Sequence, residues 1–89
     1  MLQVTDSALA LLQDALVNER SEDSQVFRLH VRDDEFVLGL DEVQQDDVEF
    51  ARDGDTVLAA PQEIAVSMLN DTTIDLETTP EGPKLVLVT

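Results

Sequence analysis

The clearest hydrophobic pattern lies near the start of the chain, where apolar residues recur at steps of three and four. Leu9, Leu12 and Leu16 would share one face of a helix. Thr5 can cap such a helix with its side-chain oxygen, and an acidic residue follows in the first turn. The spacing therefore predicts a helix over residues 5–19.

Runs of alternating apolar and polar residues predict β-hairpins after this helix. The runs are residues 26–32, 35–40, 48–51 and 56–59. The first hairpin turns at Asp33-Asp34, which is not a favoured turn pair, and the second turns at Asp53-Gly54, which is one.

The C-terminal part predicts a short helix and one more hairpin. Pro61 suits the first position of the helix, and Ile64, Met68 and Leu69 are expected on its buried face. The hairpin is formed by residues 73–78, the turn residues 80–83 and residues 84–88.

The order of these elements is helix, hairpin, hairpin, short helix, hairpin. It predicts a single domain over residues 1–89 of the α+β class, mainly β, with antiparallel or mixed strands. The hydrophobic share of 43% is ordinary for a globular chain, so disorder is not expected. The only aromatic residues are three Phe, so the core must be largely aliphatic.

The charge of the chain is strongly negative. Twenty acidic residues and five basic ones give a net charge of −15. This charge repels nucleic acid and anionic lipid, and it favours basic partners and divalent cations.

No apolar run is long enough to span a membrane or to form the hydrophobic region of a secretory signal. We therefore expect a cytoplasmic protein with neither nucleic acid nor membrane as a partner.

The sequence contains no cysteine. It therefore offers no thiolate for zinc or for an iron–sulfur cluster, no disulfide and no thiol nucleophile. His30 is the only histidine, and strand alternation places it opposite Leu29 and Val31, on a sheet face or in solvent. The serines lie in no nucleophile motif. No catalytic residue is assigned, and we expect no enzymatic activity.

Carboxylates gather near predicted strand ends. The two clusters are Asp33, Asp34 and Glu35, and Asp41, Glu42, Asp46 and Asp47. Oxygen ligands suit calcium or magnesium, but the spacing is not that of an EF-hand loop. A solvated acidic surface is the favoured interpretation, and a module that binds a divalent metal or a basic protein stays open. No metal ligand and no cofactor are assigned.

The last predicted strand is rich in apolar residues. If Leu85–Val88 lies at a sheet edge, it could pair with a second chain, so a homodimer stays open. The apolar stripe of the helix over residues 5–19 could also dock a protein partner, although packing into the core explains it better.

Several short sequence segments follow one another in an order and spacing that resemble those of a known family. They are Val4–Ala8, Arg28–Val31, Phe36–Glu42 with Asp46-Asp47, Gly54–Leu58, and Met68-Leu69 with Ile74–Leu76. In this order and spacing they resemble the HesB/IscA-like family, the A-type iron–sulfur carriers. The resemblance covers nearly the whole chain. It implies the fold of that family, with one N-terminal and one short internal helix, and an association with iron–sulfur cluster assembly.

The sequence departs from the family where the family carries its cysteines. In the family, a glycine-rich loop with the first cysteine joins the strands that correspond to residues 26–32 and 35–40, whereas this chain has Asp33-Asp34. Two further family cysteines lie in a tail that would begin after Thr89. No cluster ligand can be carried over. The resemblance does not imply cluster binding. Together with the missing cysteines it leads to the hypothesis of a non-enzymatic protein without a cluster of its own, in a protein-contact or regulatory role.

Overall fold

Helix α1, Asp6–Glu19, begins where the sequence predicts it to begin. The computed structural model describes all residues from 1 to 89. Thr5 precedes the helix with an extended backbone, and its Oγ1 accepts a hydrogen bond from the Ala8 N–H at 3.2 Å. The same hydroxyl donates to Asp75 Oδ1 at 3.0 Å, so the cap also ties the helix to a distant strand.

Replacing Thr5 with alanine should lower the free energy of unfolding by about 1 kcal/mol, because the cap of α1 is lost. The bond from Thr5 to Asp75 is lost as well. Thr5→Ser keeps an Oγ at the same position and should retain most of the stability. Urea unfolding of both variants would measure the difference, and equal stability of Thr5→Ala and wild type would contradict the role of the cap.

Two hairpins follow α1, as predicted. They comprise β2 (Gln25–Arg32), β3 (Glu35–Glu42), β4 (Val48–Arg52) and β5 (Asp55–Ala60). Asp33 and Asp34 both adopt a positive φ, 52° and 65°, and Asp53 and Gly54 do the same at 54° and 83°. Positive φ at both central residues is what a tight hairpin turn requires. Aspartate tolerates this conformation better than most residues, which explains how Asp33-Asp34 closes its hairpin without glycine.

The four strands form one sheet in the order β3-β2-β5-β4. Its two hairpins are joined by parallel pairing of β2 with β5, with Phe27 opposite Leu58. The second sheet has the order β1-β6-β7, where β6 is Thr73–Thr79 and β7 is Gly82–Val88. The strand β1, Gln3–Val4, pairs in parallel with β6 and was not predicted from the sequence.

The short helix predicted after Pro61 is present as η1, Glu63–Met68, but it is wound more widely than an α-helix. The Leu69 N–H donates to the Ile64 carbonyl at 2.8 Å, five residues back, as in a π-helix. This winding places Leu69 beneath Ile64, so both are buried, while Met68 is 51% exposed. The prediction of a buried Met68 was therefore wrong, because it assumed the spacing of an α-helix.

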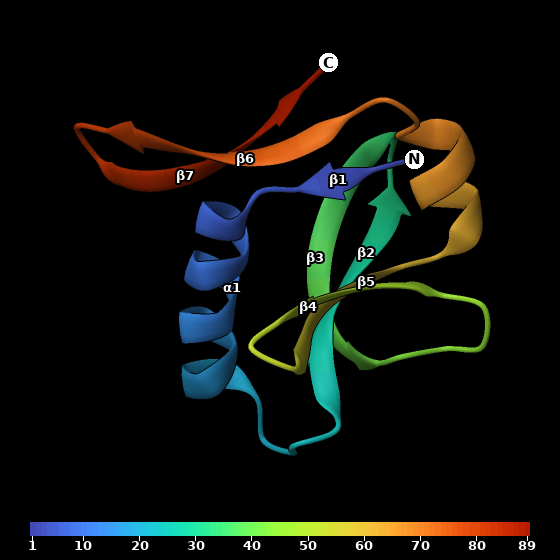
Figure 1. Cartoon of the computed structure of the whole chain (residues 1–89), viewed down its shortest axis with the longest axis horizontal. Helices are drawn as coiled ribbons and strands as arrows, with labels where there is room; N and C mark the ends of the chain where they lie inside the picture. The colour runs from blue at the N-terminus through green and yellow to red at the C-terminus, as the bar shows by residue number, and fades with distance from the viewer.

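The elements enclose one core. Helix α1 packs against β4, β5 and β6, and the three-stranded sheet lies across the end of the helix that carries its N-terminus (Figure 1). A single cluster of fourteen buried apolar residues joins α1, η1 and both sheets. This confirms the predicted α+β, mainly β class. None of the helices has the length and hydropathy needed to cross a membrane.

Candidate functional site

Two strands, β3 and β7, lie at sheet edges that face a common groove. Each pairs with only one neighbour, β3 with β2 and β7 with β6. The space beside them measures about 160 Å³ and is lined by nine residues, all of them apolar. These residues come from α1, β2, β3, β5, β6 and β7, and we call this space the apolar groove.

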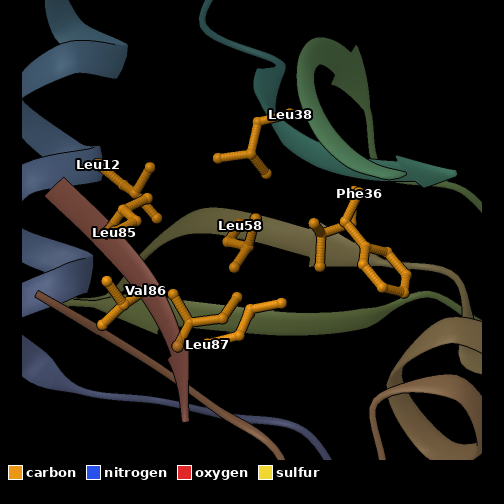
Figure 2. Close-up of a pocket in the computed structure, with 9 residues that line it drawn as sticks. Leu12, Phe36, Leu38, Leu58, Leu85, Val86 and Leu87 are labelled. Carbon is orange, nitrogen blue, oxygen red and sulfur yellow. The ribbon is translucent and has the colours of Figure 1, made fainter. Parts of the chain in front are cut away.

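The strand registers explain why the lining is apolar. Leu38 of β3 pairs with Leu29 of β2, and Phe36 lies on the same sheet face because alternate residues of a strand share a face. Leu85 and Leu87 lie on the inner face of β7 by the same alternation. Figure 2 shows Leu58 between the β3 side chains and the β7 side chains. Leu58 is fully buried. The apolar groove can bind apolar groups but offers no polar side chain for catalysis or for a metal.

The position of β7 meets the condition under which its apolar end could pair with a second chain. Leu85–Val88 belongs to an edge strand, and Leu87 and Val88 are 50% and 48% exposed. Pro83 and Lys84, near the start of β7, are of the residue types that discourage the addition of another strand. The rest of the strand, Leu85–Val88, contains no proline and no charged residue. A homodimer through this edge stays a prediction.

The most buried charged contact joins the outer face of the four-stranded sheet to the loop before β4. Arg28 Nε donates to Asp47 Oδ2 at 2.8 Å, and Arg28 Nη2 donates to Asp47 Oδ1 at 3.0 Å. The two side chains are 15% and 2% exposed. The Gln44 N–H also donates to Asp47 Oδ2, at 2.9 Å. A two-pronged contact of this kind fixes the loop on the sheet.

The Arg28 hydrogen bonds hold the pKa of Asp47 below its ordinary value of 3.8, against the opposing effect of burial, and the Gln44 N–H adds to the shift. The hydrogen bonds that Arg28 donates to Asp47 also raise the pKa of Arg28 above its ordinary value. Asp47 was expected on a solvated acidic surface, and for this residue the expectation was wrong. Arg28 is nineteen positions away in the sequence, so no local pattern reveals the pair.

His30 lies on a face of the sheet, as strand alternation predicted, and is partly buried. Its ring lies across Gly39, since a Cβ at Gly39 would be 3.6 Å from His30 Nε2. His30 forms no hydrogen bond with a serine or a carboxylate. Ser21 donates hydrogen bonds to Gln25 Oε1 from its N–H and its hydroxyl. No hydrogen bond joins His30 to any of the other three serines, Ser7, Ser24 and Ser67. The arrangement contains no nucleophile beside a base.

The remaining carboxylates are spread over strand ends and turns. Asp33 and Asp34 form the β2–β3 turn, and Asp53 forms the β4–β5 turn, where it accepts a hydrogen bond from Arg52. Nowhere do three histidine, aspartate or glutamate side chains come together as a set that could hold a metal ion. The open interpretation of a divalent-metal module therefore has no geometric support.

Comparison with known proteins bears on the fold. No protein-family model and no curated protein matches the sequence. Among solved structures, SufA of Escherichia coli, described as involved in biosynthesis of iron–sulfur clusters, superposes with a TM-score of 0.66 over 99% of this chain. This chain has the HesB/IscA-like fold. The match to SufA covers 84% of that chain, at 22% identity.

Two more structures with the HesB/IscA-like fold match nearly the full length. IscA with a 2Fe–2S cluster gives a TM-score of 0.61 at 19% identity, covering all of this chain and 82% of IscA. A protein from Aquifex aeolicus gives 0.65 at 17% identity, covering 99% of this chain and 90% of its own. At these identities the likeness establishes the fold.

The connection between β2 and β3, where the resemblance of the sequence implied a missing cysteine loop, is a tight turn. Arg32 pairs directly with Glu35, so only Asp33 and Asp34 connect β2 to β3. This turn and the C-terminal Thr89 lie toward the same end of the molecule, at the top of the view in Figure 1.

Proposed function

We propose that this chain is a non-enzymatic HesB/IscA-like protein that acts through protein contacts in iron–sulfur cluster assembly and ligates no cluster itself. One observation carries the proposal: the fold of SufA and IscA spans the chain, while the sequence contains no cysteine. The tight Asp33-Asp34 turn supports it, because such a turn has no room for a ligand-bearing loop.

The cytoplasm is the location that fits this role. The apolar groove gives the protein a surface for contacts, and its lack of polar side chains argues against catalysis there. A regulatory role and a role as a passive partner both fit the same geometry.

Incubation of the purified chain with ferrous iron and sulfide under anaerobic conditions should leave it colourless after desalting. The physical reason is the absence of thiolates, which are the usual ligands of such clusters. Visible absorbance and iron content would be measured, with IscA treated in parallel as the positive control. A stable brown species that stays with the folded chain would overturn the proposal.

An acidic module for a basic protein partner is the alternative function. Only three of the acidic side chains, Asp6, Asp47 and Asp53, form ion pairs, so most of the −15 charge faces solvent unpaired. Binding to such a partner should weaken steeply with salt.

A further inference from the structure

The free edge of β3 has an unusual distribution of charge. Its middle, Phe36–Leu40, is uncharged, and acidic residues precede and follow it. Asp33, Asp34 and Glu35 lie at one end, and Asp41 and Glu42 lie at the other. An edge strand presents unpaired N–H and C=O groups on its outer side, and charged residues in its middle usually discourage pairing. Here the middle of the strand lacks that protection.

The apolar groove lies directly beside this edge. The inward side chains of β3 that line it are Phe36 and Leu38, and across the groove lie Leu85 and Leu87 of β7 (Figure 2). Its volume of about 160 Å³ is comparable with that of a cavity of about 150 Å³ known to hold benzene. One or two branched side chains from an added strand would fill it.

Charge decides between the possible occupants. A second copy of this chain would bring another net charge of −15, most of it unpaired, and the two copies would repel each other. A segment with basic residues at both ends would meet acidic residues at both ends of Phe36–Leu40. An extended segment could then bond to the β3 backbone while its alternate side chains enter the apolar groove.

We propose that the free edge of β3 and the apolar groove bind an extended protein segment whose alternate apolar side chains are flanked by lysine or arginine. For its biological setting this rests on the protein-contact function proposed above. Its physical test is independent of iron–sulfur chemistry, so a coloured product in the reconstitution experiment would leave it standing.

The probe is a short capped peptide with lysines at both ends and valines at alternate central positions. Two control peptides keep its length, one with serine in place of valine and one with glutamate in place of lysine. Calorimetry in about 0.15 M salt measures affinity, and amide shifts in the NMR spectrum of the chain report the site. Saturable binding with the largest shifts in Phe36–Leu40 and in Leu85 and Leu87 is expected, and the serine peptide should bind at least about tenfold more weakly.

Variants of the chain separate the two contributions. Leu87→Asp places a charge at the mouth of the apolar groove and should weaken valine-peptide binding about tenfold or more. Leu87 is half exposed, so the variant should fold, and Leu87→Ala gives a milder test of the same contact. Asp34→Asn removes one acidic charge, retains a residue that tolerates positive φ, and should weaken binding about twofold to threefold. Asp53→Asn, the same change in the turn of the other hairpin, should leave affinity unchanged.

Several results would overturn the proposal. They are equal affinity of the valine and serine peptides, shifts centred away from β3 and β7, no saturable binding, or unchanged affinity of Leu87→Asp. Sedimentation of the free chain decides the remaining alternative. A dimer that Leu87→Asp converts to a monomer would assign the apolar groove to a second copy of the chain instead.

Discussion

Replacing Asp47 with asparagine is expected to lower the free energy of unfolding by about 3 kcal/mol at neutral pH. The Asp47 carboxylate is 2% exposed and accepts two hydrogen bonds from Arg28, which is itself 15% exposed. An amide cannot supply the negative charge, so the largely buried Arg28 guanidinium would lose its hydrogen-bonded counter-ion and keep only the weaker charge interaction with Asp41. Urea unfolding monitored by circular dichroism would measure the loss.

Asp46→Asn is the matched control for this prediction. It makes the same chemical change one residue earlier, at an exposed position with a φ of 69° that asparagine also tolerates. Its stability should stay within about 0.5 kcal/mol of wild type. Equal losses from Asp46→Asn and Asp47→Asn would show that general charge, and not the contact with Arg28, determines the effect.

The stabilisation from Asp47 should also depend on pH. Because folding lowers the pKa of Asp47 below 3.8, the folded state favours the ionised form, and stability from this group is present above that pH. It is lost as pH falls through the lower, folded-state pKa. The stability difference between wild type and Asp47→Asn should therefore be constant above about pH 5 and shrink below about pH 4. A difference that persists unchanged at pH 2 would contradict the assignment.

The second large effect is expected from Leu58→Ala, which should cost about 3 kcal/mol. Leu58 is fully buried, pairs with Phe27 on β2 and Phe50 on β4, and lies at the base of the apolar groove. Its removal would leave a cavity at the point where α1 and both sheets meet. A loss of this size is a large share of the stability of a chain of this length, so the urea midpoint should fall clearly.

Val17→Ala is the control for Leu58→Ala. Val17 lies on the solvent side of α1 and is 66% exposed, so its truncation should change the free energy of unfolding by no more than about 0.5 kcal/mol. A loss below about 1 kcal/mol for Leu58→Ala would mean that the surrounding side chains collapse into the space. Such a collapse would also reduce the apolar groove and weaken binding of the valine peptide.

The sequence predicted the elements whose signals are local. The α1 cap at Thr5, the alternation in β2 and β3, and the Asp53-Gly54 turn all depend on residues close together in the chain, and the structure confirms them. Two departures have local causes that the residue types did not reveal. A two-residue strand such as β1 is too short to show a pattern, and the π winding of η1 changed which residues are buried.

The candidate site was much less predictable. The sequence identified Leu85–Val88 as an apolar strand that could lie at an edge, but not the groove it shares with β3. Arg28 and Asp47 gave no sign of forming a pair, and the acidic clusters offered no indication of which member would be buried. The apolar groove, the Arg28–Asp47 pair and the burial of Asp47 all depend on which distant segments of the chain lie together, and the sequence does not show this.

By itself the sequence determined the order of helices and hairpins, the strong negative charge and the absence of thiolate chemistry, because periodicity, turn preferences and composition are properties of local sequence. Only the tertiary structure decided three features: the parallel pairing of β2 with β5, the burial of Asp47 against Arg28, and the common groove of β3 and β7. These depend on contacts between residues far apart in the chain, and such contacts form only when the two sheets and α1 close over a shared core.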